Sequence, residues 1–117
     1  MLARDIMTTN VITIAPTARI YELTRLLAEH HISGVPVCED DQVVGIVSEA
    51  DLLAMTNGHR VGDIMSPEVI GVDAEEPVEK VAAVLHEKGI KRVPVCSNGR
   101  LVGIISRADI VAAMARR

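Results

Sequence analysis

The stretch Gly45–Asp51, GIVSEAD, recurs at Gly103–Asp109 as GIISRAD. Outward from these two segments, residues 5–56 and 63–114 align at a constant offset of 58 without a gap, and 19 of the 52 paired positions are identical. Two copies of one supersecondary unit are expected to bury their apolar faces together. A functional site should then lie where both copies carry the same polar residues.

The chain divides at a short polar connector that contains the turn signal Asn57-Gly58. With 117 residues in all, each half is marginal for a core of its own, so the two halves are expected to fold as one body. The expected division is repeat 1 at residues 1–56, the connector at 57–62 and repeat 2 at 63–117.

Each repeat is expected to run strand, helix, strand, strand, helix, which gives a mixed α/β (α+β) fold class. Short β-branched runs predict the strands, and Asn98-Gly99 is a strong hairpin signal. Pro36 and Pro94 have no amide donor, so each strand should be an edge there or begin there. The expected strands lie at residues 11–14, 35–38, 43–47 and 69–72, and on both sides of the turn at 97–100.

Apolar residues at helical spacing predict the helices. Ile20, Leu23 and Leu27 mark the first helix of repeat 1, and Val78, Val81 and Leu85 mark its counterpart. Pro77 suits the first turn of that counterpart, and Gly89 suits its end. The expected helices lie at residues 17–31, 49–55, 77–88 and 107–115.

Apolar residues make up 49% of the chain and aromatic residues 1%. Such apolar richness in a short chain predicts that part of the surface is buried against another subunit, as a homodimer. The expected contributors are Leu23, Leu27, Val81, Leu85, Ile110, Val111 and Met114.

Composition argues against several other partners. A net charge of −4 with almost no aromatics disfavours nucleic-acid binding. No apolar run is long enough for a membrane span, and the opening residues lack a signal-peptide core, so a cytoplasmic protein is expected. The four histidines show no metal-site spacing. Cys38 and Cys96, at equivalent positions, fit small buried residues at strand ends, with a disulfide or a redox switch as alternatives.

The repeated pattern G-x-x-S-x-x-D stands where a strand leads into a helix. It comprises Ser48 and Asp51 in repeat 1, and Ser106 and Asp109 in repeat 2. One interpretation is purely local, because a serine cap with an acid three residues later is nearly a capping box. The other is a ligand site, because a helix N-terminus attracts phosphate, a glycine allows close approach and a carboxylate accepts ribose hydroxyls. The two interpretations are compatible, because a capping side chain can exchange its hydrogen bond to the helix for one to a ligand.

The chain resembles a tandem pair of cystathionine β-synthase (CBS) domains, a Bateman module. The marks are the DIM openings at residues 5–7 and 63–65, the VPVC segments at 35–38 and 93–96, and the GIVSEAD and GIISRAD segments. The resemblance implies two β-α-β-β-α units packed sheet to sheet with pseudo-twofold symmetry, leaving two clefts. It also implies adenosine ligands (AMP, ADP or ATP, less so S-adenosylmethionine or NAD) and pairing of modules through their helices.

By position, the resemblance assigns roles to residues of both copies. The aspartates would bind ribose hydroxyls, and the serines would lie near the ribose or first phosphate. Two strand segments would present backbone groups to adenine, and two Val-Pro pairs would wall the base, with plain core packing as the alternative. These candidates are Asp51, Asp109, Ser48, Ser106, Ile12, Thr13, Ile70, Gly71, Val35, Pro36, Val93 and Pro94.

The two copies differ in charge around this motif. Repeat 2 carries Lys91, Arg92 and Arg107, which suit a phosphate, where repeat 1 carries Ser33, Gly34 and Glu49. The alternative for the three basic side chains is simple solvation.

The sequence thus predicts a stand-alone regulatory module that binds adenosine nucleotides without catalysis and acts on an unidentified effector protein. The alternative is a structural or interaction module with unoccupied clefts that acts through its helix face. An enzyme is disfavoured, because no nucleophile and base can be paired.

Overall fold

The computed structural model describes residues 1–55 and 57–116. The chain forms two compact units, and their boundaries differ from those of the repeats. Unit 1 combines Met1–Val11 with Ile70–Arg117, whereas unit 2 is the continuous segment Ile12–Val69. The opening segment of each repeat therefore packs in the unit that holds most of the other repeat, an exchange that the sequence did not predict. Thr56 and Arg117, at the ends of the predicted repeats, lie outside the described residues.

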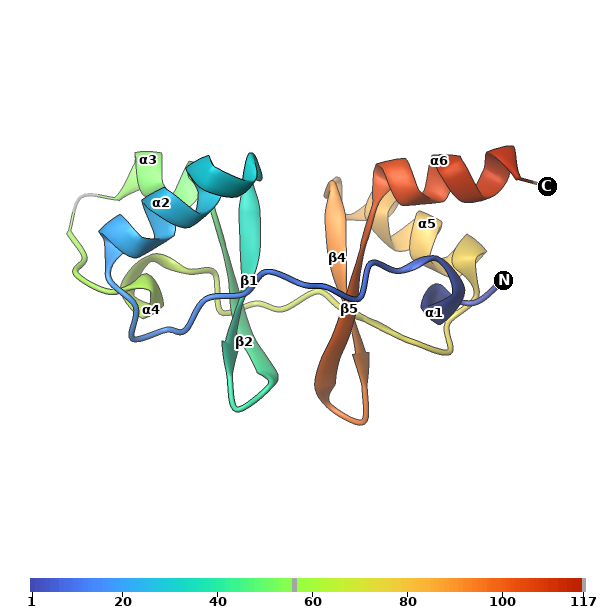
Figure 1. Ribbon diagram of the computed structural model, residues 1–117, viewed down its shortest axis with the longest axis horizontal. Helices are drawn as coiled ribbons and strands as arrows, with labels where there is room; N and C mark the ends of the chain where they lie inside the picture. The colour runs from blue at the N-terminus through green and yellow to red at the C-terminus, as the bar shows by residue number, and fades with distance from the viewer. Residues whose placement is uncertain (56, 117) are drawn as a thin grey trace. The chain divides into compact units, whose positions relative to one another are not determined.

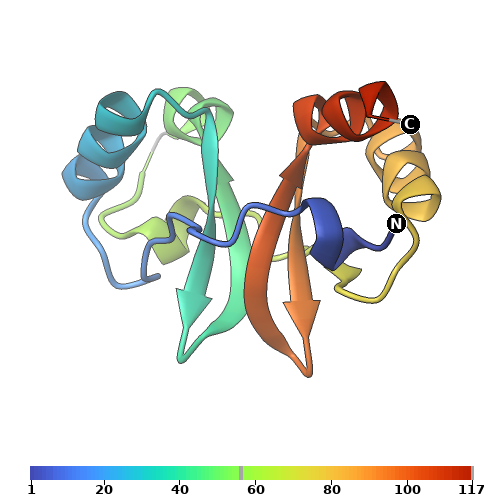
Figure 2. The same cartoon turned by 45° about the vertical axis from the view of Figure 1, so that its right-hand side comes forward.

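Unit 1 is built on a three-stranded sheet in the order β3-β4-β5, in which β3 pairs parallel to β4 and β4 pairs antiparallel to β5. Figure 2 shows α5 and α6 on one side of the β4–β5 hairpin. The elements of unit 1 are α1 (Ala3–Ile6), β3 (Val72–Asp73), α5 (Val78–Glu87), β4 (Arg92–Ser97), β5 (Arg100–Ser106) and α6 (Arg107–Ala115).

Unit 2 has the same plan around an antiparallel hairpin, β1-β2, with helices α2 and α3 following the same order along the chain (Figure 1). The elements of unit 2 are α2 (Ile20–His30), β1 (Gly34–Glu39), β2 (Gln42–Ser48), α3 (Glu49–Ala54) and α4 (Val61–Ile64). The predicted mixed fold class and both hairpins are confirmed.

Both hairpin turns place two successive residues in the left-handed region. Asn98 and Gly99 have φ of 53° and 80°, and Asp40 and Asp41 have φ of 51° and 66°. Two positive φ angles are the requirement of the two-residue hairpin turn, and Asn, Asp and Gly meet it at the lowest cost. The turn that the sequence predicted from Asn98-Gly99 is confirmed.

The predicted first strand of each repeat is largely wrong. Of residues 11–14 only Ile14 pairs, in a parallel bridge with Val37, and of residues 69–72 only Val72 belongs to β3. The carbonyl of Pro36 accepts the amide of Ile14 at 3.2 Å, but proline has no N–H to continue the ladder upstream. The ladder of β3 likewise begins at Val72–Val95, one residue past Pro94. Each proline thus lies where the pairing of its strand with the first segment begins, so its missing N–H interrupts no ladder.

The helices begin and end close to the predicted positions. α2 begins at Ile20 and not at residue 17. The amide of the preceding residue, Arg19, donates a hydrogen bond to Glu22 Oε2 at 2.6 Å. Pro77 is the residue before α5, one position earlier than predicted. Gly89, with φ of 62°, follows the last turn of α5 as the sequence predicted.

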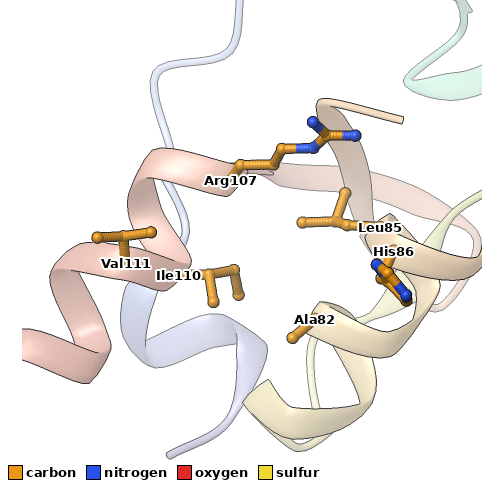
Figure 3. Close-up of a pocket in the computed structure, with 6 residues that line it drawn as sticks. All are labelled: Ala82, Leu85, His86, Arg107, Ile110 and Val111. Carbon is orange, nitrogen blue, oxygen red and sulfur yellow. The ribbon is translucent and has the colours of Figure 1, made fainter. Parts of the chain in front are cut away.

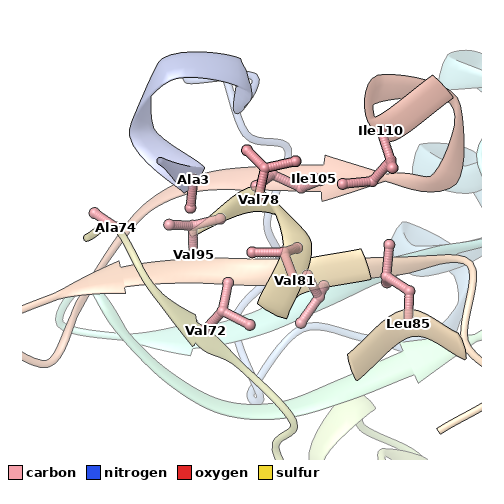
Figure 4. Close-up of a cluster of buried hydrophobic side chains, with 10 residues drawn as sticks. Ala3, Val72, Ala74, Val78, Val81, Leu85, Val95, Ile105 and Ile110 are labelled. Carbon is pink, nitrogen blue, oxygen red and sulfur yellow. The ribbon is translucent and has the colours of Figure 1, made fainter. Parts of the chain in front are cut away.

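Each unit has its own aliphatic core, made from the apolar stripes of its helices and the inner residues of its hairpin. Figure 4 shows the core of unit 1, in which Ala3 of α1 is buried beside residues of the second repeat. In unit 2, Val61 of α4 is buried in the same way. The core of unit 1 comprises Ala3, Val72, Ala74, Val78, Val81, Leu85, Val93, Val95, Ile105 and Ile110.

Most of the residues expected at a homodimer interface are therefore placed elsewhere. Leu23, Leu27, Val81, Leu85 and Ile110 are buried in the core of their own unit, because units this small need every apolar stripe for themselves. Only Val111 and Met114 of the expected set are exposed, at 64% and 62%.

Candidate functional site

The N-terminus of α6 carries the repeated Ser and Asp of unit 1. The amide of Ser106 donates to Asp109 Oδ2 at 2.8 Å, and the amide of Asp109 donates to Ser106 Oγ at 3.2 Å. This reciprocal pair is a capping box with aspartate in place of glutamate. The local interpretation of the motif is therefore realised at this helix.

Unit 2 repeats the arrangement at α3. The amide of Ser48 donates to Asp51 Oδ2 at 2.8 Å, and the hydroxyl of Ser48 lies 3.2 Å from the same oxygen. An ionised carboxylate accepts hydrogen bonds at about four positions. A capping aspartate therefore retains acceptor capacity for the two hydroxyls of a ribose, so the capping and ligand roles are compatible.

The hairpin register brings the other candidates of unit 1 to the same end of the sheet. β4 and β5 pair Arg92 with Ser106, and the amide of Arg107 donates to the carbonyl of Lys91 at 3.0 Å. Gly71 lies against the backbone of Pro94, since a Cβ there would be 3.4 Å from its carbonyl oxygen. The structure thus brings Lys91 and Arg92 beside the N-terminus of α6, and Gly71 beside Pro94, two residues further along β4.

The equivalent contacts recur in unit 2, where Gly34 pairs with the candidate Ser48 and the amide of Glu49 donates to the carbonyl of Ser33. Thr13 and Gly71 are exposed, while Ile12 and Ile70 are half-buried. These four residues precede the first ladder pair of their segments, so their backbone groups lie outside the sheet ladders.

The apolar candidates take part in the cores. Val35, Val93, Pro36 and Pro94 are buried, and both valines belong to the core clusters. Their burial favours the core-packing alternative for these side chains. A role at the edge of a base pocket stays a prediction.

The basic candidates are not equivalent. Arg107 donates from Nε to the carbonyl of Ile90 at 3.0 Å, which directs its guanidinium toward α5. Lys91 is exposed at the start of β4, and Arg92 is half-buried. Of the three, Lys91 is the least constrained, and a phosphate role for all three stays a prediction.

The glycines of the motif have a role that the sequence did not reveal. A Cβ on Gly103 would lie 2.5 Å from Met7 Sδ, and one on Gly45 would lie 2.6 Å from Met65 Sδ. The methionines of the two DIM segments thus cover these glycines. The sequence predicted that these glycines allow a ligand to approach the backbone closely, but a methionine side chain fills the space beside each of them.

The aspartates of the DIM segments are caps as well. Asp5 Oδ2 accepts the amide of Leu2 at 2.7 Å, at the start of α1. Asp63 Oδ2 accepts the amides of His59 and Arg60 at 3.0 and 2.9 Å, at the start of α4. The repeated DIM is therefore a structural element: its aspartate starts a short helix and its methionine covers the facing glycine.

The two backbone hydrogen bonds from His59 and Arg60 hold the pKa of Asp63 below its usual range. A lowered pKa in the folded state stabilises that state fully above the ordinary pKa of an aspartate, and this contribution is lost as the pH falls through the lowered value. We expect Asp63→Asn to be less stable than the wild type at neutral pH, with the difference closing in acid. Urea unfolding across this pH range measures it. The control Asp40→Asn, in a turn that asparagine also suits, should show no such gap, and a gap constant with pH would contradict the assignment.

The cysteines do not resemble nucleophiles. Neither cysteine is in a disulfide, and both are half-buried. Burial, and secondly the negative charge of Asp73, raises the pKa of the Cys96 thiol. A raised pKa leaves less thiolate at neutral pH, and the thiolate is the reactive form.

Residues 1–55 and 57–116 contain no group of three or more His, Cys, Asp or Glu side chains that could hold a metal ion. In the same part of the chain, no helix has both the length and the apolar character needed to cross a membrane.

Comparison with known proteins gives the class of this fold. A family model of the CBS domain matches residues 3–57 and again 61–116. The chain therefore belongs to the CBS domain family and contains two CBS domains in tandem.

Two solved structures are similar over nearly their whole length. One is CBSX2 of Arabidopsis thaliana in complex with AMP, with 32% identity, a TM-score of 0.93, and coverage of 98% of this chain and 96% of that chain. The other is the CBS domain pair of protein MJ0100 in complex with 5′-methylthioadenosine and S-adenosyl-L-methionine. It has 30% identity, a TM-score of 0.86, and coverage of 99% and 97%.

A curated relative shows the same module inside a larger protein. The inosine-5′-monophosphate dehydrogenase of Thermoplasma acidophilum is 37% identical over 103 residues, which is 87% of this chain but 21% of the enzyme. The chain thus spans about a fifth of that relative's length.

Proposed function

We propose that this chain is a regulatory module that binds an adenosine ligand, foremost AMP, ADP or ATP, and catalyses no reaction of its own. The observation that supports it most is the similarity, at a TM-score of 0.93, to a CBS pair in complex with AMP. The MJ0100 complex makes S-adenosylmethionine a second ligand to test.

The preferred site is the one in unit 1, around the N-terminus of α6. Asp109 accepts the ribose hydroxyls there while its Oδ2 also caps the helix, and Ser106 lies beside the first phosphate. Lys91 and Arg92 supply positive charge at the start of β4, next to Ser106 in the sheet register. α6 has nine residues and α3 has six, so the α6 N-terminus is also the more complete anion site.

The equivalent position in unit 2 is less suited to a phosphate. Glu49 there stands where Arg107 stands in unit 1, and Ser33 and Gly34 replace the two basic residues before the hairpin. A carboxylate beside a helix N-terminus competes with an anionic ligand. Unit 2 would then bind a neutral adenosine derivative, or an adenine nucleotide more weakly.

Thermal unfolding with added ligand tests the proposal. A ligand at about 100 times its dissociation constant stabilises the folded state by roughly 2.7 kcal/mol. We expect the midpoint to rise with AMP, ADP or ATP and to stay unchanged with guanosine or cytidine nucleotides. A midpoint unchanged by all the adenine nucleotides and by S-adenosylmethionine would exclude the proposal. Mass spectrometry of ligand released from freshly purified protein would name the ligand.

We also propose that the module acts as a homodimer. The exposed apolar side chains of the helices support it, namely Leu53 at 89%, Val111 at 64% and Met114 at 62%. Leu53 lies on α3, whereas Val111 and Met114 lie three residues apart on α6, and exposed apolar side chains of this kind favour burial against another subunit.

A further inference from the structure

Unit 1 has an open groove between its two long helices. The groove has a volume of about 340 Å³ and is lined by Ala82, Leu85, His86, Arg107, Ile110 and Val111. Figure 3 shows α5 supplying three of these residues and α6 the other three, with Arg107 at one end of the groove and Ala82 at the other. All of these residues belong to unit 1, so the groove is complete within that unit.

The walls of the groove are apolar. Leu85 and Ile110 are 3% and 8% exposed and belong to the core of unit 1, whereas Val111 is 64% exposed. The groove therefore has a firmly packed apolar base and one exposed apolar side. Its volume falls within the range of about 300–1,000 Å³ found for small-molecule sites, which combine apolar walls with a few polar groups that orient the ligand.

The polar groups of the groove are cationic or hydrogen-bond donors. Nε of Arg107 donates to the carbonyl of Ile90 at 3.0 Å, which fixes the guanidinium and leaves its terminal N–H groups as further donors. Within residues 1–55 and 57–116, Arg107 makes no ion pair and no acidic side chain lines the groove. The imidazole of His86 has an N–H to donate whether it is neutral or charged.

This combination of groups selects one class of ligand. A carboxylate matches the planar fork of a guanidinium, and an alkyl chain attached to it would lose contact with water along the apolar walls. An amphiphile with an amine would bring a second positive charge to Arg107. A nucleoside would place polar base and ribose groups against Leu85 and Ile110, which offer them no hydrogen bonds.

We infer that the α5–α6 groove binds a small aliphatic carboxylate, with its carboxylate on Arg107 and its alkyl chain along Leu85 and Ile110 toward Ala82. The site is separate from the Ser106–Asp109 cap and does not rest on the proposed adenosine ligand.

The equivalent face of unit 2 has the opposite charge. At the offset of 58, Glu49 stands there for Arg107, and the polar Thr24 stands for Ala82. A carboxylate ligand would meet a carboxylate side chain at that end. The inferred site is therefore specific to unit 1, and unit 2 serves as an internal control.

Titration of the whole chain with butanoate, hexanoate and octanoate, without nucleotide, tests the site by calorimetry. Each methylene group that leaves water contributes about 0.8 kcal/mol, which is about fourfold in affinity. Because the groove is open on one side, we expect about a twofold to fourfold gain for each added methylene. Octanol and octylamine, with the same chain length, should bind more weakly than octanoate.

Removing the charge shows whether Arg107 holds the carboxylate. Arg107→Gln should weaken octanoate binding about fivefold or more, the ratio that corresponds to roughly 1 kcal/mol for an ion pair, and should remove the preference for octanoate over octanol. The matched control is Arg116→Gln, the same change just beyond the end of α6 and outside the lining. It should leave the affinity unchanged.

Filling the groove gives a readout that does not depend on charge. Ala82→Phe places a ring in the groove and should abolish binding of octanoate. Ala83→Phe, at the next position of α5, is exposed and outside the lining, so it should bind as the wild type does. Urea unfolding checks that both variants are folded. Since Arg107 is exposed, Arg107→Gln still decides the question where Ala82→Phe does not fold.

Amide chemical shifts locate the ligand on the chain. Octanoate should move resonances of α5 and α6 and leave those of α2 and α3 unchanged. The inference is overturned where no carboxylate of the series binds saturably, where Arg107→Gln binds octanoate as the wild type does, or where the shifts fall on α2 and α3. None of these results bears on the adenosine site, which thermal unfolding with nucleotides tests separately.

Discussion

Gly103→Ala is expected to destabilise unit 1 by about 1–3 kcal/mol, the usual cost of an added methyl group in a well-packed site. The new Cβ would lie 2.5 Å from Met7 Sδ and 2.7 Å from its Cγ, so Met7 must move off the sheet. Met7 cannot leave freely, because its own amide and that of Thr8 hold the segment in place. They donate to the carbonyls of Ala3 and Ile104, respectively. Urea unfolding measures the loss.

A double variant shows whether the methionine is the cause. Met7→Ala removes the obstructing atoms, so adding Gly103→Ala to it should cost much less than Gly103→Ala costs in the wild type. Gly45→Ala in unit 2 should not be rescued by Met65→Ala to the same extent, because its Cβ also meets the carbonyl oxygen of Ser66 at 2.8 Å. That carbonyl accepts the amide of Ile46 and cannot yield easily.

Gly71→Ala is the control for the general cost of replacing a glycine. Its nearest neighbour would be a carbonyl oxygen at 3.4 Å, an ordinary contact, and its φ is not positive. It should therefore be nearly neutral in stability. Equal losses for Gly71→Ala and Gly103→Ala, or additive losses for Met7→Ala and Gly103→Ala, would show that the methionine does not fill this space.

Asp109→Ala is expected to weaken binding of an adenine nucleotide about tenfold to a hundredfold. The estimate follows from hydrogen bonds to a charged group, worth roughly 1.5–3 kcal/mol, lost from the ribose hydroxyls. The same change removes the acceptor for the Ser106 amide, so the free energy of unfolding should also fall, by about 1 kcal/mol. Calorimetric titration, at a temperature where the variant is folded, separates affinity from stability.

Two other variants complete this test. Asp5→Ala removes a cap from α1 in the same unit, so it should lower stability without changing affinity. Asp51→Ala removes the equivalent carboxylate of unit 2 and should weaken nucleotide binding less than Asp109→Ala. An affinity unchanged in Asp109→Ala would mean that the aspartate is only a cap. A greater loss in Asp51→Ala would reverse the preference between the units.

Local signals in the sequence predicted much of the fold. The Asn98-Gly99 turn, the end of α5 at Gly89 and the capping boxes at Ser48 and Ser106 all depend on residues within one turn of each other. The order of elements followed from the repeat. The first strand of each repeat was predicted too long, because its length depends on the strand with which it pairs. In that partner strand, Pro36 or Pro94 ends the ladder of hydrogen bonds. The β-propensity of a single β-branched run does not show over how many residues it will pair with another strand.

In the candidate site, too, local contacts were predicted and contacts between distant segments were not. The spacing of Ser106 and Asp109 in the sequence predicted the helix cap. The contact of Met7 with Gly103 joins segments far apart in the chain, so a glycine that a methionine covers looked like one kept open for a ligand. Each DIM methionine stands 38 residues before the glycine of its own repeat but covers the glycine of the other repeat, so the spacing in the sequence did not reveal the contact.

The exchange of opening segments has a consequence for how such a protein can be built. Ala3 lies in a core whose other members all come from the second repeat, and Val61 lies in a core made otherwise from residues of the first. A chain with one repeat could complete such a core only by borrowing the segment of another chain, as in domain swapping. Fusing two repeats makes the borrowing intramolecular. The folding of each unit then no longer depends on protein concentration, as that of an obligate dimer does.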